Sequence, residues 1–165
     1  MLHGEFDLIR DFATPVAGVW SAYADPDLRH RWHRIPGRDS QLTLDFRNDG
    51  SETLTGSFAA SGEVEVIDSR MRFLDISPHE RIVSAHVFAL NGVRRWVSLV
   101  TVTFTPVEGG TRVRHHEQYA FLAWSGDGAH DRAHLRGSMN LSFNALDVVL
   151  DGSQPACRIS RCSRE

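Results

Sequence analysis

Six polar side chains stand together in RHHEQYAF, residues 114–121, a stretch that otherwise alternates like a strand. Within it, His115 and Glu117 are two residues apart, so on a strand they share one face at about 7 Å. An imidazole and a carboxylate at that spacing can share a proton or orient a hydroxyl group of a ligand. Three interpretations are open: a polar cluster with a purely structural role, a ligand-orienting pair, or an acid–base pair.

Two histidines four residues apart, His130 and His134, lie in HDRAH. On a helix this spacing places both imidazoles on one face, as in the HExxH helix of zinc proteases. A zinc site also needs a third ligand and a general base, and Asp131 is shorter than the glutamate of that motif. We therefore predict histidines that face solvent, and no metal site.

Other common motifs for chemistry are missing from the sequence. It contains no GxSxG nucleophile motif, phosphate-binding loop or dinucleotide fingerprint, so we predict no cofactor. The two cysteines, Cys157 and Cys162, have four residues between them and make a poor metal motif. A thiol pair near the end of the chain fits a cytoplasmic protein better than a disulfide scaffold.

The composition excludes several classes of function. A chain of 165 residues with 41% hydrophobic and 24% charged residues is typical of one soluble globular domain. The net charge of −3 and the shortness of the basic cluster RHRWHR (29–34) argue against nucleic-acid binding. The first residues lack the apolar segment of a signal peptide, and no apolar run reaches the roughly 18 residues of a membrane span. We expect a cytoplasmic protein with no membrane and no nucleic-acid partner.

The elements that must position the polar residues begin with a strand at residues 6–12, where hydrophobic and polar side chains alternate. Thr14-Pro15 and Asp25-Pro26 each start a short helix, because a capping residue is followed by a proline. Together these segments predict one strand followed by two short helices.

Residues 41–122 are predicted to form antiparallel strands and turns, with Asn91-Gly92 as the strongest hairpin signal. The polar stretch after the turn at residues 48–50 has no clear pattern. A helix follows at residues 129–151 and ends at Gly152. Its hydrophobic residues recur at intervals of three and four: Leu135, Met139, Phe143, Leu146 and Leu150.

These elements predict one domain at residues 1–152 and a polar tail at residues 153–165. The expected fold class is α+β, with a curved antiparallel sheet of about six to seven strands wrapped on the C-terminal helix. The helix is the only predicted element long enough to cover one face of such a sheet.

Five motifs in this order along residues 6–151 resemble the SRPBCC superfamily, which has the START-like or helix-grip fold. The motifs are FATPVAGVWSAYADPDLRHRW, LDFRNDG, FLDISPHERIV, SLVTVTFTPVEGGTRV and HEQYAF. Within the superfamily the chain resembles bacterial homologues of the activator of the Hsp90 ATPase. The resemblance implies a cavity between sheet and helix that binds a small, largely apolar molecule, and some superfamily members are polyketide cyclases. Asp49 departs from the glycine pair of relatives, which affects the local turn.

The resemblance also selects the face of the sheet that lines the cavity, because it places Phe104 on the core side. A two-residue turn at Asn91-Gly92 pairs residue 90 with 93 and residue 88 with 95. In that register the face of Phe104 receives small residues from the preceding strand: Val83, Ala85, Val87 and Ala89. Small side chains under a helix leave volume unfilled, so we expect a pocket there.

The predicted ligand-binding residues line this pocket or, for Trp32, lie near its expected mouth. They are Trp32, Trp96, Ser98, His115, Glu117, Tyr119, Phe121, Met139, Phe143 and Leu146. For the aromatic residues and the helix residues, ordinary core packing is the competing interpretation.

The opposite face of the sheet is predicted to expose four large hydrophobic side chains, Phe88, Leu90, Val97 and Leu99. This is more contiguous apolar surface than a monomer usually presents to water. The hypothesis that follows is a homodimer packed partly through this face.

The favoured function is binding of a small apolar or aromatic molecule, with His115, Glu117, Tyr119 and Ser98 orienting its polar group. One alternative is an enzyme, a cyclase or dehydratase that uses Glu117 and His115 as acid and base without a cofactor. Another alternative is a protein-interaction module that uses the outer face of the sheet.

Overall fold

The computed structural model describes residues 1–36, 39–60 and 62–153. The predicted tail cysteines, Cys157 and Cys162, lie outside the described residues. The helices and strands follow one another as β1 (Leu2–Phe12), α1 (Val16–Ala24), α2 (Pro26–Trp32), β2 (Gln41–Leu44), β3 (Ser51–Ala60), β4 (Glu63–Ser77), β5 (Arg81–Leu90), β6 (Val93–Val107), β7 (Gly110–Phe121) and α3 (Ala129–Ser153).

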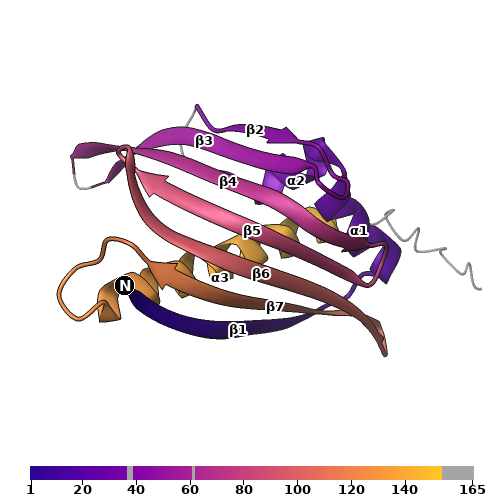
Figure 1. The fold of residues 1–165 in the computed structure, drawn as a ribbon. Coiled ribbons are helices and arrows are strands. Elements are labelled where there is room, and N and C mark those ends of the chain that lie inside the picture. The colour runs from indigo at the N-terminus through magenta and orange to yellow at the C-terminus, as the bar shows by residue number, and fades with distance from the viewer. Residues whose placement is uncertain (37–38, 61, 154–165) are drawn as a thin grey trace, which may run out of the picture.

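The seven strands form one antiparallel sheet in the order β1-β7-β6-β5-β4-β3-β2. Helix α3 runs across one face of this sheet, and α1 and α2 lie at one end of the same face (Figure 1). We call this covered face the inner face and the opposite one the outer face. The α+β helix-grip fold predicted from the sequence is confirmed.

Local sequence signals explain several of these elements. The Asp25 side chain caps α2 by accepting hydrogen bonds from the backbone N–H groups of Asp27 and Leu28, each at 2.9 Å, and Pro26 is the first helical residue. At the β5–β6 turn, Asn91 and Gly92 both have positive φ angles, 51° and 78°, as a two-residue hairpin requires.

The pairing of β5 with β6 differs from the predicted register. Leu90 pairs with Val93 and Ala89 with Arg94, but Phe88 then pairs with Trp96, so Arg95 is an extra residue in β6. Such a β-bulge exchanges the two faces of every following residue relative to the partner strand. The predicted assignment is therefore right for β6 and wrong for β5.

Contacts from distant parts of the chain hold this bulge. The Arg95 carbonyl accepts hydrogen bonds from the backbone N–H groups of Leu122 at 2.8 Å and Ala123 at 3.2 Å. Its guanidinium pairs with Asp131 at 2.9 Å. The loop after β7 and the first turn of α3 thus fix the extra residue.

The bulge moves the small residues of β5 to the outer face. Val83, Ala85, Val87 and Ala89 do not line an interior pocket, and the inner face of β5 instead carries Ile82, Ser84, His86 and Phe88. Phe88 stacks on Trp96 with ring centroids 3.9 Å apart, and Leu90 pairs with Ile67 of the same face. The prediction that Phe88 and Leu90 are exposed on the outer face is wrong.

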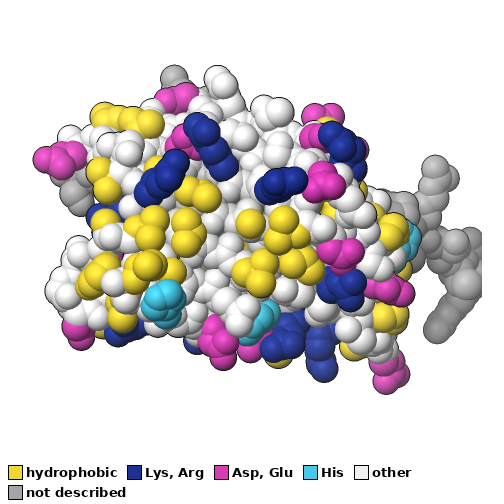
Figure 2. Space-filling model, in the orientation of Figure 1, with side chains coloured by type: hydrophobic (Ala, Val, Ile, Leu, Met, Phe, Trp, Pro, Cys, Tyr) yellow, Lys and Arg dark blue, Asp and Glu magenta, His cyan; other side chains and the backbone are white. Residues whose placement is uncertain are grey.

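The outer face nevertheless has an apolar centre over β5 and β6, as Figure 2 shows. An open groove of about 740 Å³ crosses β5, β6, β7 and β1 there. Its apolar side chains include Ala85, Val87, Val97 and Leu99. Two of the small residues that suggested an internal pocket, Ala85 and Val87, therefore line this external groove.

The core lies between the inner face and α3. Phe143 and Leu146 of α3 are almost completely buried, and Phe143 meets Phe12 edge to face at 5.8 Å. Arg10 ties β1 to α3, because its guanidinium donates to the side-chain oxygens of Asn140 and Asn144, each at 2.7 Å. Among the described residues, no helix is long and apolar enough to cross a membrane.

Candidate functional site

Two glutamates point into the core from the inner face of the sheet, near its two sides. Glu52 of β3 is 2% exposed and Glu117 of β7 is 3% exposed. Between them, the register aligns Met71, His86 and Ser98 across neighbouring strands. Because a buried carboxylate is costly unless it is paired, the partners of the two glutamates define the chemistry of this region.

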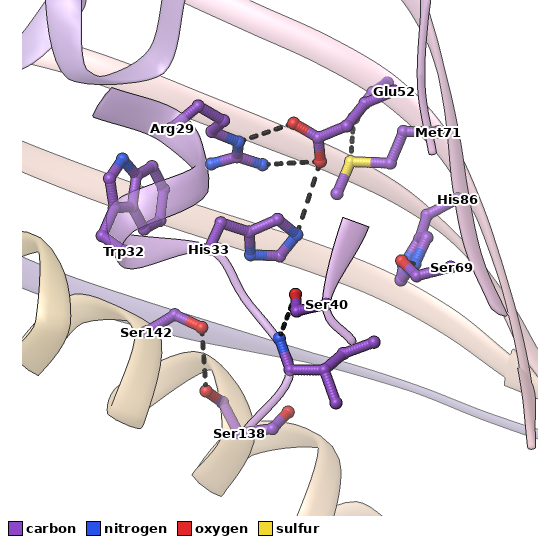
Figure 3. Close-up of polar contacts among 12 residues, drawn as sticks. Arg29, Trp32, His33, Ser40, Glu52, Ser69, Met71, His86, Ser138 and Ser142 are labelled. Carbon is purple, nitrogen blue, oxygen red and sulfur yellow. Dashed lines mark hydrogen bonds and ion pairs between the residues drawn. The ribbon is translucent and has the colours of Figure 1, made fainter. Parts of the chain in front are cut away.

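Glu52 is paired with Arg29 of α2 (Figure 3). The Arg29 guanidinium donates through Nε to Oε2 at 2.6 Å and through Nη2 to Oε1 at 2.9 Å. Its planar face also lies over the Trp32 ring at 4.3 Å and the Tyr23 ring at 5.3 Å. Burial raises the pKa of the Glu52 carboxyl, but the charge and hydrogen bonds of Arg29 outweigh it, so the pKa is lowered.

His33, which follows α2, approaches the same carboxylate. Its Nε2 lies 3.4 Å from Oε1 of Glu52, too far for a good hydrogen bond, and has no hydrogen-bond partner among the described residues. Burial lowers the pKa of His33 to about 3, and the positive charge of Arg29 acts in the same direction. His33 is therefore neutral at pH 7.

Tyr23 of α1 carries a second buried polar atom without a hydrogen-bond partner among the described residues, its hydroxyl oxygen. Burial raises the pKa of this hydroxyl above its usual range, so it stays protonated. Tyr23 and His33 thus bring two neutral, unsatisfied polar atoms to one region, which is uncommon in a protein interior.

Glu117 is held in a different way. Ser98 Oγ donates to Oε1 at 2.6 Å, and His115 Nε2 lies 3.0 Å from Oε2. Burial raises the pKa of the Glu117 carboxyl, but the hydrogen bond and charge of His115, with smaller effects of His86 and Ser98, lower it overall. The imidazole–carboxylate pair predicted from the spacing in β7 is present.

A third polar pair lies between the two glutamates. His86 Nε2 and Ser69 Oγ are 2.8 Å apart, and the His86 ring meets the Trp96 ring edge to face at 6.4 Å. Burial lowers the pKa of His86. Trp96 Nε1 is buried without a hydrogen-bond partner among the described residues.

A small internal cavity of about 50 Å³ lies between α2, α3 and the inner face. Its polar lining consists of Tyr23, Arg29, His33, Glu52, Ser84 and His115. Most of the remaining lining is apolar and includes Trp32, Met71 and Met139. A cavity of about 150 Å³ holds one benzene, so this one has room for a few water molecules or a very small molecule.

The predicted site residues fall into three groups. Trp32, His115 and Met139 line the cavity, and Ser98 and Glu117 lie behind His115. Trp96, Tyr119 and Phe121 form a separate buried cluster with Leu135. Phe143 and Leu146 pack in the main core. The acid–base role of Glu117 and His115 stays a prediction.

Sequence reasoning missed Arg29, His33 and Glu52. Arg29 stands in RHRWHR, which as a sequence is a basic surface cluster, yet its side chain is buried against Glu52. Glu52 and Leu54 alternate with Ser51 and Thr53, and that spacing could have indicated a shared inner face.

The metal motif considered above has no matching geometry. In residues 1–36, 39–60 and 62–153, no group of three or more His, Cys, Asp or Glu side chains is placed to hold a metal ion. The His130 and His134 rings lie 6.4 Å apart on the first turns of α3, and both side chains are exposed.

Several solved structures share this architecture. A Rhizobium leguminosarum protein is 28% identical over 92% of this chain and 96% of its own, with a TM-score of 0.77. The protein Mll3558 of Rhizobium loti is 30% identical over 90% of this chain and 97% of its own, with a TM-score of 0.74. CalU16 of Micromonospora echinospora, at 16% identity and TM-score 0.62 over 88% of this chain and 75% of its own, shares the fold alone.

The sequence matches no curated protein. Residues 13–151, however, match the family described as Activator of Hsp90 ATPase homolog 1-like protein. That stretch contains both short helices, six of the seven strands and nearly all of α3. The chain therefore belongs to the Activator of Hsp90 ATPase homolog 1-like family.

Proposed function

We propose that this protein binds a small molecule in the cavity between α2, α3 and the inner face of the sheet. The family and the fold suggest a ligand-binding or interaction module. The observation that favours binding at this place is the pair of buried, unsatisfied atoms, Tyr23 Oη and His33 Nε2, in residues that line the cavity. Buried polar atoms without partners usually mark a water or ligand position.

The cavity has to enlarge before it can hold a ring-sized ligand. Met71 from β4 and Met139 from α3 both line it, and methionine is the most adaptable of the large apolar side chains. Movement of these two side chains would open volume without breaking the Arg29–Glu52 pair. We therefore expect the cavity volume to adjust to the size of the ligand through movement of the Met71 and Met139 side chains.

Within this proposal His115 contacts the ligand and Glu117 orients His115. His115 lines the cavity, and its Nε2 is held by Glu117. The Glu117 carboxylate in turn accepts from Ser98. Of the residues predicted from the sequence, His115 would then contact the ligand, Glu117 would orient His115, and Ser98 would hold Glu117.

Mass spectrometry of the purified protein under native conditions would reveal a copurified ligand directly. A thermal-shift screen with small apolar compounds would find others, because a ligand that binds the folded state raises the melting temperature. Met139→Phe fills the cavity, so it should abolish the shift produced by any ligand that the wild type binds.

Leu141→Phe is the matched control, since Leu141 lies on the same helix and is 69% exposed. It should leave ligand-induced shifts unchanged. A protein that carries no ligand and responds to no compound, or a Met139→Phe variant that responds like the wild type, would contradict the proposal.

A further inference from the structure

The permanent charge beside the cavity is already neutralised. Arg29 donates to both oxygens of Glu52, and its face is covered by the Trp32 and Tyr23 rings. Among the described residues that line the cavity, an anionic ligand would find no unpaired arginine, and it would lie beside the Glu52 carboxylate. Binding an anion would therefore remove its hydration without a compensating partner.

A cationic ligand would also lack a favourable charge partner in the described lining of the cavity. The same Arg29 guanidinium would repel it at short range, and Glu52 has no charge left unpaired. The second carboxylate, Glu117, is not among the described residues that line the cavity, whereas its partner His115 is. Within the described part of the cavity wall, neither an anionic nor a cationic ligand thus meets an unpaired counterion.

The unsatisfied atoms are neutral instead. The Tyr23 hydroxyl stays protonated, because burial raises its pKa, and can donate one hydrogen bond. His33 is neutral at pH 7, because burial lowers its pKa to about 3, and its Nε2 has no partner among the described residues. Besides the polar residues named above, the lining is apolar, with Phe73, Val100 and Met139 as examples.

Given the small-molecule binding proposed above, on which this inference rests, we infer that the ligand is a neutral molecule with an apolar body and one hydroxyl or carbonyl oxygen. The oxygen accepts a hydrogen bond from the Tyr23 hydroxyl, and the apolar body occupies the space between the sheet and Met139. Carboxylates and amines of the same size are excluded by the desolvation of their charge.

Four probes with the same ring separate these classes: benzyl alcohol, toluene, benzoate and benzylamine. Dissociation constants at neutral pH are measured by NMR titration of the wild-type protein and of Met139→Ala, in which the ring has more room. Benzyl alcohol is expected to bind about tenfold or more tightly than benzoate and benzylamine, and about fivefold more tightly than toluene.

The two tyrosines of the chain provide a matched pair of variants. Tyr23→Phe keeps the ring and removes the hydroxyl, so the advantage of benzyl alcohol over toluene should disappear. Tyr119→Phe makes the same change in the separate Trp96 cluster and should leave the advantage intact. Unfolding curves of both variants show whether each is folded.

The possible outcomes separate this inference from the proposed function. If benzoate or benzylamine binds as tightly as benzyl alcohol, or toluene equals it in the wild type, the ligand class is wrong while the binding site stands. An alcohol advantage that survives Tyr23→Phe also overturns the inference. If none of the four probes binds to either protein, the inference fails. The proposed function fails with it only when native mass spectrometry finds no copurified ligand and the thermal-shift screen finds no response.

Discussion

Glu52 and Glu117 are two buried carboxylates on one face of one sheet, and they are held in opposite ways. Glu52 is paired with a guanidinium that keeps its charge at every physiological pH, and this pair joins α2 to β3. Glu117 is held instead by the Ser98 hydroxyl and the His115 imidazole, without an arginine. Two equally buried carboxylates are therefore held by an arginine ion pair in one place and by hydroxyl and imidazole contacts in the other.

The largest effect is expected when the fixed pair is broken. Glu52→Gln leaves the Arg29 charge buried without its counterion, which should lower the free energy of unfolding by about 3–5 kcal/mol. Urea denaturation followed by circular dichroism measures this change. The double variant Arg29→Met/Glu52→Leu removes both charges and should recover much of the loss. A single variant that costs less than about 1 kcal/mol would show that the pair is not desolvated as described.

Replacing the second carboxylate, Glu117, should lower the free energy of unfolding by less. Glu117→Gln keeps the shape and loses the charge-assisted hydrogen bonds, so the expected loss is about 1.5–3 kcal/mol, again by urea denaturation. Ser98→Ala removes one of these bonds and should cost about 1 kcal/mol. If Glu117→Gln lowers the free energy of unfolding by more than Glu52→Gln does, the arginine pair of Glu52 is not the stronger of the two arrangements.

The histidine beside Glu52, His33, should make the stability of the protein depend on pH. His33 has a folded pKa of about 3, below its unfolded value near 6.5, so the unfolded state binds more protons between these values. Stability should therefore be fully present above about pH 6.5 and fall as the pH decreases, by about 1.4 kcal/mol per pH unit for one proton. The lowered pKa of His86 acts in the same direction.

Denaturation series between neutral and mildly acidic pH would measure this slope. His33→Gln removes the titrating group and should make the slope smaller by close to one proton. An unchanged slope in that variant would mean that His33 already exchanges protons freely in the folded state.

The smallest effect on stability is expected on the outer face. The homodimer predicted from the sequence would bury Val87, Val97 and Leu99 of the groove, rather than Phe88 and Leu90. Leu99 is 40% exposed, so Leu99→Asp should change the free energy of unfolding by no more than about 0.5 kcal/mol and yet halve the mass of a dimer. Light scattering tests this at micromolar concentration, with Leu141→Asp as the control on α3. If the wild-type protein has the mass of a single chain, the homodimer hypothesis is wrong.

The fold could be predicted because its signals are local. Asp25-Pro26 marks the start of α2, Asn91-Gly92 marks the hairpin, and strict alternation in β7 places His115 and Glu117 on one face. The family resemblance identified that face as the inner one. None of these signals depends on contacts with distant residues.

The register of β5 and half of the site could not be predicted, for the opposite reason. The extra residue Arg95 is stabilised by Leu122, Ala123 and Asp131, which are distant in the sequence. Glu52 and Arg29 make sense only together, and they come from a strand and a helix that meet in the folded protein. A basic cluster and a polar strand give no sign, taken separately, that they neutralise each other.

The position of β1 at the edge of the sheet also matters during synthesis. Among the described strands its partner is β7 alone, with Leu2 opposite Phe121 and Phe12 opposite Thr111, so the first of the seven strands to be made stays unpaired until the seventh has been made. At about 5–20 residues per second, roughly 5–20 s pass before β7 has followed β1 out of the ribosome. Throughout that interval the nascent chain carries an unpaired strand with Phe6 and Leu8, which invites association with other chains. The speed of translation, as much as the free energy of unfolding, should then set the yield of correctly folded protein.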